Sequence, residues 1–204
     1  MVQQPPTVFI VDDDRAMRES LKALMKTVGL NAQTYSSADD FLEAYDSVQR
    51  GCLVADVRLP GMSGLELQEK LLKEHITLPV IIITGHGDVP MAVQAMKLGA
   101  LNFIEKPFRD QVLLDNIKKA IDLDTKIRNK QVEYAEIQEK LKKLTAREKE
   151  IMNLLITGEP GKAIAFDLGI SQKTVDFHRS NITKKMNVKS LIELVHLLKN
   201  IQTT

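Results

Sequence analysis

Residues 7–29, TVFIVDDDRAMRESLKALMKTVG, change within a few residues from a strand pattern to a helix pattern. Thr7–Val11 is a short run rich in β-branched and aromatic residues, which predicts a strand. Between Arg15 and Val28 the apolar residues recur at helical spacing, and Gly29 is a helix stop signal. The segment therefore predicts one strand and one helix, joined by the three consecutive acidic residues 12–14.

The same pattern of a strand followed by a helix recurs until about residue 120. Further strands are predicted at 32–35, 53–55, 80–84 and 102–104, and helices at 38–45, 65–74, 89–98 and from 110 onward. Continuous apolar strands that alternate with helices are typical of a parallel sheet covered on both faces. We therefore predict a five-stranded, doubly wound α/β domain over residues 7–122.

A single long helix is predicted from residue 110 to residue 144, because this segment contains neither Gly nor Pro. Its apolar residues fit the a and d positions of one heptad frame, interrupted by Lys130. The stripe has two interpretations, a coiled coil with a second copy or packing of a surface helix against its own domain. We assign residues 123–143 to a helical linker. The stripe consists of Ala120, Leu123, Ile127, Tyr134, Ile137, Leu141 and Leu144.

The remaining segment, residues 144–204, is predicted to be an all-α domain of four helices. The helices are expected at 146–157, 162–168, 172–186 and 191–199, and Thr145 and Ser171 stand where N-caps belong. The second and third of these are separated by a short turn at Gly169 and Ile170. Two helices joined in this way form a helix-turn-helix, whose second helix can enter the DNA major groove.

Charge is distributed unevenly along the chain, although the net charge is only +1. Residues 1–120 contain 13 Lys and Arg against 16 Asp and Glu, whereas residues 145–204 contain 9 against 6. A basic C-terminal part fits an anionic partner such as double-stranded DNA.

The composition excludes other classes of protein. Cys52 is the only cysteine, so neither an internal disulfide nor a cysteine-rich metal site can form. No apolar run of 18 residues exists, and the N-terminus has no basic region of a signal peptide. We expect a cytoplasmic protein with no membrane contact.

Polar residues follow four of the predicted parallel strands. Asp12 and Asp13 come after the first strand, Asp56 after the third, Thr84 ends the fourth, and Lys106 follows the fifth. The carboxyl ends of parallel strands meet at one edge, so these side chains should converge. Three crowded carboxylates repel one another and need a cation, and oxygen ligands suit Mg2+. One carboxylate could then attack a phosphoryl group, with Lys106 and Thr84 binding the phosphoryl oxygens.

Four blocks of sequence resemble the receiver domains of response regulators, and those of the NarL/FixJ family and its FixJ-like branch in particular. They are VDDD (11–14), VADVRLPGMSG (54–64), IIITGHGD (81–88) and FIEKPF (103–108). The resemblance covers residues 7–122 and implies a flavodoxin-like fold, with a cis peptide bond between Lys106 and Pro107.

The resemblance also implies a role for each residue of the pocket. Asp56 would be the phosphoacceptor and Lys106 the phosphate-binding lysine. Thr84 and Phe103 would form the switch pair. Arg58 and His86 would flank the acyl phosphate and tune its hydrolysis. The Mg2+ ligands would come from Asp12, Asp13, Asp56 and the backbone carbonyl of Arg58.

Three blocks in the C-terminal part resemble the LuxR-type helix-turn-helix over residues 141–200. They are LTAREKEIM (144–152), GKAIAFDLGIS (161–171) and TVDFHRSNITKKM (174–186). Asp176 stands where many relatives have a basic residue, and the loop Glu159-Pro160-Gly161 is unusual; both put the target sequence in doubt. His178 is expected to be packed. The residues implied to contact DNA are Lys173, Thr174, Asp176, Phe177, Arg179 and Ser180, and the helical pattern adds Lys184 and Lys185 for phosphates.

Together these features predict a phosphorylation-dependent transcription regulator of a two-component system, which is not an enzyme. A sensor histidine kinase would phosphorylate Asp56, and the change would drive dimerisation and DNA binding, with RNA polymerase as a further partner. The long helix could instead hold a constitutive dimer. One rival is a protein–protein output without DNA. Another is a phosphoaspartyl phosphatase, which needs a carboxylate two residues beyond Asp56, where this chain has Arg58.

Overall fold

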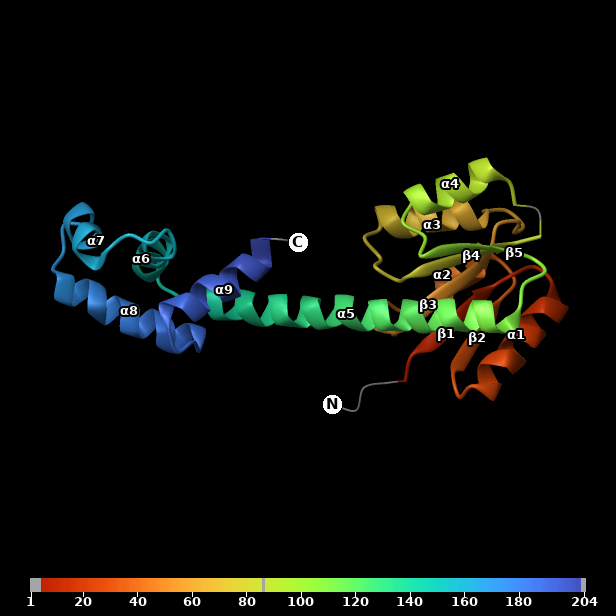
Figure 1. Ribbon diagram of the computed structural model, residues 1–204, viewed down its shortest axis with the longest axis horizontal. Coiled ribbons are helices and arrows are strands. Elements are labelled where there is room, and N and C mark those ends of the chain that lie inside the picture. The colour runs from red at the N-terminus through yellow and green to blue at the C-terminus, as the bar shows by residue number, and fades with distance from the viewer. Residues whose placement is uncertain (1–4, 86, 203–204) are drawn as a thin grey trace. The chain divides into compact units, whose positions relative to one another are not determined.

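The computed structural model describes residues 5–85 and 87–202, with only the backbone for 199–202 (Figure 1). The chain divides into two compact units, residues 1–128 and 129–204, and each is described by itself. Among the described residues, no helix combines the length and the apolar character that crossing a membrane requires.

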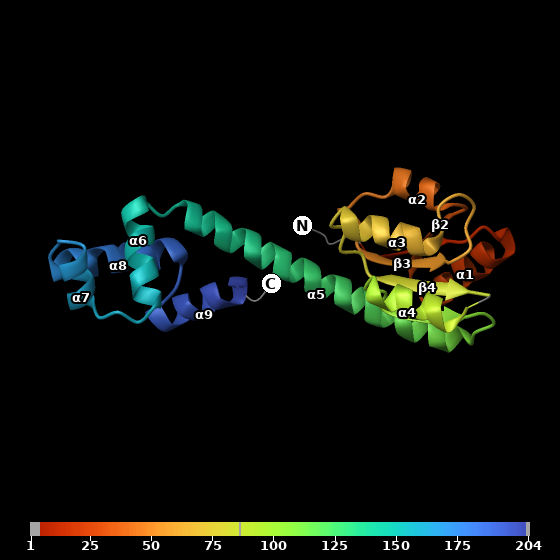
Figure 2. The same cartoon turned by 90° about the horizontal axis from the view of Figure 1, so that it is seen from above.

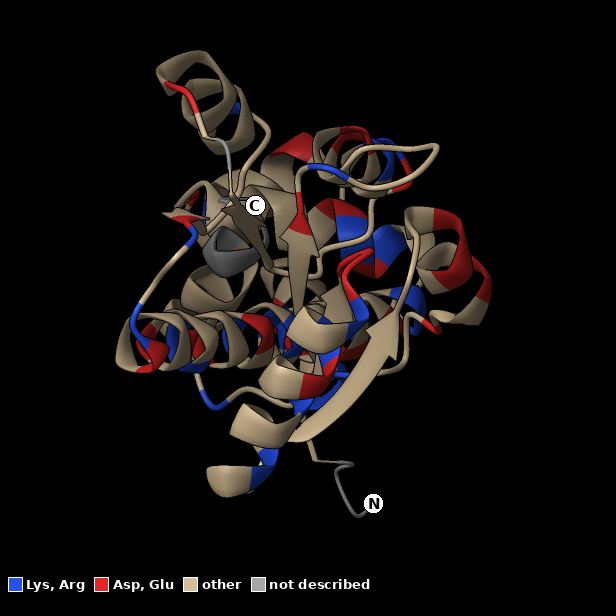
Figure 3. Cartoon of the chain, turned by 90° about the vertical axis from the view of Figure 1, so that its right-hand side faces the viewer, with Lys and Arg blue, Asp and Glu red and all other residues tan. Residues whose placement is uncertain are grey.

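The first unit is built on a five-stranded parallel sheet with the order β2-β1-β3-β4-β5, which confirms the predicted doubly wound fold. Strands β3 and β4 are buried along their whole length. Only Asp56 and Glu105 among the strand residues are charged, and charged residues lie mostly on helices and loops (Figure 3). The strands are β1 (Thr7–Val11), β2 (Asn31–Tyr35), β3 (Gly51–Asp56), β4 (Val80–Thr84) and β5 (Asn102–Glu105).

Helices cover both faces of the sheet (Figure 2). Alternate strand residues point to opposite faces, so Phe9 and Leu53 pack with α2, α3 and α4, whereas Ile10 and Val54 pack with α1 and α5. The helices are α1 (Arg15–Thr27), α2 (Ala38–Ala44), α3 (Gly64–Lys73), α4 (Val89–Lys97) and α5 (Asp110–Lys142).

The second unit is helical and encloses a core of its own. As predicted, Thr145 and Ser171 are the N-caps of α6 and α8, and each accepts a hydrogen bond from the backbone N–H three residues on. Helices α7 and α8 are joined by a short turn and form a helix-turn-helix. The helices that follow α5 are α6 (Ala146–Ile156), α7 (Gly161–Asp167), α8 (Gln172–Met186) and α9 (Leu191–Gln202).

Helix α5 belongs to the first unit as far as Arg128. The carboxylate of Asp124 is buried and accepts hydrogen bonds from the Gly51 N–H (3.0 Å) and from Nε of Arg128 (2.8 Å). The Arg128 guanidinium also donates to the carbonyl oxygens of Ser47 and Gln49. These contacts lie beyond residue 122, where the sequence analysis ends the first domain.

The heptad stripe of α5 is shared between the two cores. Ala120 is buried in the first unit, and Ile137 and Leu144 are buried in the second. Between them, Leu123 is 37% exposed and Tyr134 is 45% exposed. The ends of the stripe therefore pack against the chain's own units, which leaves only its middle for contact with another molecule.

Candidate functional site

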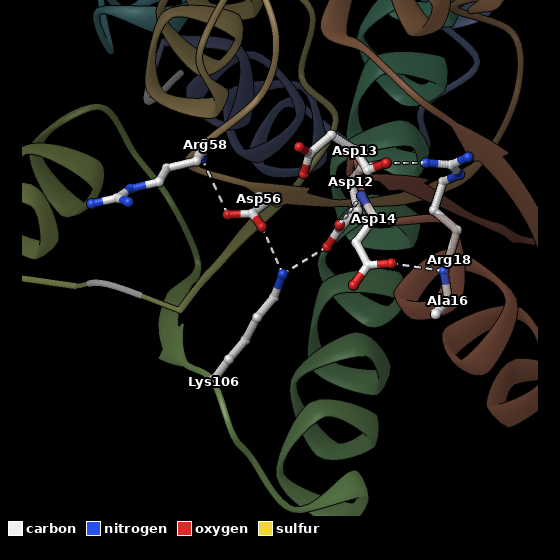
Figure 4. A network of polar contacts seen from close by, with 8 residues as sticks. All are labelled: Asp12, Asp13, Asp14, Ala16, Arg18, Asp56, Arg58 and Lys106. Carbon is white, nitrogen blue, oxygen red and sulfur yellow. Dashed lines mark hydrogen bonds and ion pairs between the residues drawn. The ribbon is translucent and has the colours of Figure 1, made fainter.

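Three acidic side chains meet at the carboxyl ends of β1 and β3 (Figure 4). Asp12, Asp13 and Asp56 each place a carboxylate oxygen within 4.8 Å of the others. Asp12 and Asp56 are buried, and Asp13 is exposed. The structure thus brings together the acidic residues that the sequence analysis placed at this edge.

Lys106 bridges two of these carboxylates. Its Nζ lies 2.7 Å from Oδ2 of Asp12 and 2.6 Å from Oδ2 of Asp56 (Figure 4). Its backbone is fixed by a hydrogen bond of 2.7 Å from the Lys106 N–H to the carbonyl oxygen of Thr84. The peptide bond to Pro107 is cis, as the family resemblance implied.

Burial and the bridge oppose each other in setting the ionisation of the pocket. Burial raises the pKa of Asp12 above its ordinary value, although hydrogen bonds and charge from Lys106 act against it. Burial alone would lower the pKa of Lys106, but its bonds to Asp12 and Asp56 outweigh burial and raise it. Lys106 therefore stays cationic at neutral pH, while the site still holds more carboxylates than cations, a charge balance that favours binding of a further cation.

The turn after β1 is held by hydrogen bonds within the acidic segment and from α1. Oδ1 of Asp12 accepts from the Asp14 N–H, and Oδ1 of Asp14 accepts from the Ala16 N–H and caps α1. Arg18 donates from Nη1 to the carbonyl oxygens of Asp12 (2.7 Å) and Asp13 (2.9 Å). Sequence reasoning missed Arg18, whose only signal was a basic residue on the first turn after the acids.

The loop after β3 approaches the Asp56 backbone closely. The Arg58 N–H donates to Oδ1 of Asp56 at 3.1 Å, while the Arg58 side chain points away from the carboxylates (Figure 4). A Cβ on Gly64 would lie 2.1 Å from the Asp56 carbonyl oxygen, so only glycine fits there. The role of the Arg58 carbonyl stays a prediction, and His86 lies outside the described residues.

The predicted switch residues occupy neighbouring strands. Thr84 ends β4 and is fully buried. Phe103 lies on β5 and, like Met91 of α4, is partly buried against the core of the first unit. A Cβ on Gly87 would lie 2.8 Å from Cε1 of Phe103 and 3.2 Å from Cγ2 of Thr84. The ring and the methyl group thus pack against the same backbone, a role of Gly87 that the sequence did not indicate.

Helix α8 presents a polar face to solvent. Val175, Ile182 and Met186 form the buried stripe that the sequence analysis predicted. Thr174 is half-buried and its hydroxyl contacts that of Ser171 at 2.8 Å. Phe177 is 63% exposed, an unusual surface position for a large aromatic side chain. The exposed members of the predicted DNA-contact set are Lys173, Asp176, Phe177, Arg179, Ser180 and Lys184.

Lys185 has a partner inside the second unit. Its Nζ lies 2.6 Å from Oε2 of Glu148, a buried side chain that also accepts from the Thr145 N–H. The Lys185 side chain is 35% exposed. Its ammonium therefore joins α8 to α6, and its predicted phosphate contact would have to compete with that ion pair. His178 is half-buried, in keeping with a packed residue.

The chain matches two family models. Residues 8–118 match the response regulator receiver domain, and residues 142–198 match the bacterial regulatory proteins of the luxR family. It is 43% identical to the transcriptional regulatory protein FixJ of Rhizobium meliloti over 191 residues, 94% of each chain. The chain belongs to the NarL/FixJ family of response regulators. This response regulator is also 44% identical to nodulation protein W of Bradyrhizobium diazoefficiens over 190 residues, 93% of this chain and 84% of that protein.

Solved structures of response regulators have the same architecture. The response regulator StyR has a TM-score of 0.86 and 45% identity, covering 96% of this chain and 98% of that one. Full-length FixJ from B. japonicum has a TM-score of 0.59 and 38% identity, covering 98% of both chains. This response regulator therefore combines a receiver domain with a LuxR-type DNA-binding domain in one chain, as a regulator of transcription in a two-component system does.

Proposed function

We propose that Asp56 accepts a phosphoryl group from a sensor histidine kinase, and that this modification controls dimerisation and DNA binding. The observation that carries the proposal is the convergence of Asp12, Asp13, Asp56 and Lys106 at one edge of the sheet. On this proposal the receiver spans residues 7–122, the linker 123–143 and the DNA-binding domain 144–204. The protein works in the cytoplasm as a regulator rather than as an enzyme.

The residues of the pocket fit Mg2+. Three carboxylates with oxygen atoms within 4.8 Å of one another offer the hard oxygen ligands that this ion prefers. We assign its ligands to Asp12, Asp13, Asp56 and the Arg58 carbonyl, through the side chains directly or through water. When bound, the ion supplies positive charge that offsets the charge of the carboxylates and of the phosphoryl group.

The chain's own residues then perform the transfer. An oxygen of Asp56 forms a bond to phosphorus while the bond from phosphorus to the kinase histidine nitrogen breaks. Lys106, already cationic, turns from the carboxylates to a phosphoryl oxygen and offsets its charge. Thr84, at the end of the neighbouring strand, donates its hydroxyl to another phosphoryl oxygen, and Phe103 repacks with it.

The exposed apolar part of α4 is the proposed dimer face. Val89 is 76% exposed, Val93 46% and Met96 50%, and a shallow pocket of about 420 Å3 lies among Ala92, Val93, Met96 and Lys97. Contiguous exposed apolar surface is typical of an interaction site. The second route to a homodimer is the exposed middle of the α5 stripe, Leu123 with Tyr134.

Helix α8 is the proposed recognition helix, and RNA polymerase is a further partner of the bound dimer. Lys173, Arg179 and Lys184 are exposed and can contact phosphates. Asp176 can accept from a cytosine amino group, and Phe177 can contact a thymine methyl group. Thr174, Ser180 and Lys185 complete the proposed contact set. Two recognition helices held in one dimer would bind two half-sites with increased effective affinity.

Analytical ultracentrifugation in Mg2+, with and without beryllofluoride as a phosphoryl mimic, tests the proposal. The wild type is expected to pass from monomer to dimer on addition of beryllofluoride, and Asp56→Ala is expected not to respond. A dimer in every sample would move the interface to α5, and a monomer in every sample would refute the dimer switch. Salt-dependent DNA binding by the full chain separates this function from a protein–protein output.

A further inference from the structure

We propose that Arg18 is a positioning residue of the acidic pocket, which fixes the turn carrying Asp12 and Asp13 and thereby sets the affinity of the pocket for Mg2+. The inference rests on the proposed function, because it concerns the same site. It assigns a task to a side chain that neither binds the ion nor touches the phosphoryl group.

The contacts of Arg18 are specific to this turn. One nitrogen, Nη1, donates to two consecutive carbonyl oxygens, 2.7 Å to that of Asp12 and 2.9 Å to that of Asp13 (Figure 4). Hydrogen bonds from a charged donor are stronger than neutral ones. Because both acceptors are backbone atoms, Arg18 restrains the peptide planes themselves and occupies neither of the two carboxylates.

Asp13 depends most on this restraint. Asp12 is buried, and further bonds fix it, from the Asp14 N–H to its carboxylate and from its own N–H to the Tyr35 carbonyl. Asp13 is exposed, so burial does little to hold it. Its carboxylate nevertheless lies within 4.8 Å of Asp12 and Asp56. The hydrogen bond from Arg18 to the Asp13 carbonyl therefore holds in place Asp13, the solvent-exposed carboxylate residue of the pocket.

Positioning and simple charge predict opposite effects on Mg2+ binding. Arg18 is a cation beside a cation site, so if charge alone mattered, its removal would strengthen binding of Mg2+. If Arg18 positions the turn, its removal weakens binding. Contacts that orient metal ligands typically change metal affinity by roughly 10–100-fold when they are removed, and we expect about tenfold here because only the backbone is held.

The test is calorimetric titration of MgCl2 into the full chain for the wild type, Arg18→Ala, Arg18→Lys and Arg15→Ala. Arg15 is the matched control, an exposed arginine on the same first turn of α1. Arg18→Ala is expected to weaken Mg2+ binding about tenfold, and Arg15→Ala to leave it unchanged. Arg18→Lys keeps the charge on a shorter side chain and should fall between them; should Arg18→Ala fail to fold, this variant takes its place.

A further variant separates failure of this inference from failure of the proposed function. Asp13→Asn removes a proposed ligand and must weaken Mg2+ binding if the pocket is the metal site. If it does so while Arg18→Ala binds Mg2+ as tightly as the wild type, or more tightly, the role of Arg18 is refuted and the site stands. If Asp13→Asn and Arg18→Ala both leave Mg2+ binding unchanged, the metal site itself is refuted.

Discussion

Replacing Asp124 by alanine is expected to destabilise the first unit by about 3 kcal/mol, the scale of breaking a buried ion pair from one side. The Asp124 side chain is 2% exposed and that of Arg128 20%. The substitution leaves the buried Gly51 N–H without its acceptor, which alone costs about 1–3 kcal/mol. Arg128 keeps its bonds to the Ser47 and Gln49 carbonyls. The total loss of stability should therefore stay near the lower end of the range of about 3–5 kcal/mol that is typical of breaking a buried ion pair from one side.

Two other substitutions identify the source of the effect. Asp124→Asn keeps an acceptor for the Gly51 N–H but removes the charge facing Arg128, and it should cost about 1–2 kcal/mol. Lys73→Ala breaks the pair between Lys73 and Glu69, which has the same i,i+4 spacing and a similar distance of 2.7 Å, but side chains 71% and 44% exposed. That change should cost less than about 0.5 kcal/mol.

Urea unfolding followed by circular dichroism measures the free energies, and hydrogen exchange at residues 46–51 localises the change. The expected order is Asp124→Ala, then Asp124→Asn, then Lys73→Ala. If Asp124→Ala were no more destabilising than Lys73→Ala, burial would not be what gives this pair its strength.

Four further outcomes follow from individual contacts. Lys185→Ala should destabilise the second unit by roughly 2–3 kcal/mol, measured by urea unfolding, because it leaves the buried Glu148 carboxylate without its cationic partner. Lys184→Ala should leave stability unchanged but weaken DNA binding and lower its salt slope by about 1; equal effects of the two lysines would contradict the structure. Burial raises the pKa of Glu148, but bonds from Lys185 and Thr145 outweigh burial, and the net pKa is lowered. The second unit should therefore keep this stabilisation above pH 4.5 and lose it as the pH falls further, which unfolding measured from neutral pH to well below pH 4.5 will show. Gly87→Ala places a Cβ 2.8 Å from the Phe103 ring and should shift the monomer–dimer equilibrium even without beryllofluoride. Sedimentation identical to that of the wild type would contradict this prediction.

The sheet and the carboxylate pocket could be predicted because both depend on local patterns. Apolar runs that alternate with helical spacing define the order of strands and helices, and the rule that strand ends share an edge brings Asp12 and Asp56 together. The contacts of Arg128 with residues 47–49 could not be predicted in this way. Their separation of about 80 residues leaves no trace in local spacing. Arg18 and Gly87 were missed because each acts on a backbone or a ring whose position only the fold defines.

Two expectations about helices needed the three-dimensional structure. The heptad frame of α5, interrupted by Lys130, suggested one apolar stripe along the helix. An ideal α-helix drifts by about 20° per heptad, and Ala120 and Ile137 pack in different cores. Lys184 and Lys185 looked equivalent in sequence. Consecutive helical residues point about 100° apart, so Lys184 is exposed whereas Lys185 reaches Glu148 on α6.

A network of hydrogen bonds connects β5 to the long helix α5. The Phe103 N–H donates to Oδ1 of Asn102, Nδ2 of Asn102 donates to Oδ1 of Asn116 on α5, and Nδ2 of Asn116 donates to the Val112 carbonyl. Each donor in this network of hydrogen bonds has its acceptor, so β5 cannot shift at Phe103 without breaking one of these bonds or moving α5. Helix α5 is thus fixed to the first unit at two points, Asn116 and Asp124. A change in the pocket that reaches Phe103 would act on this helix, which continues to Lys142.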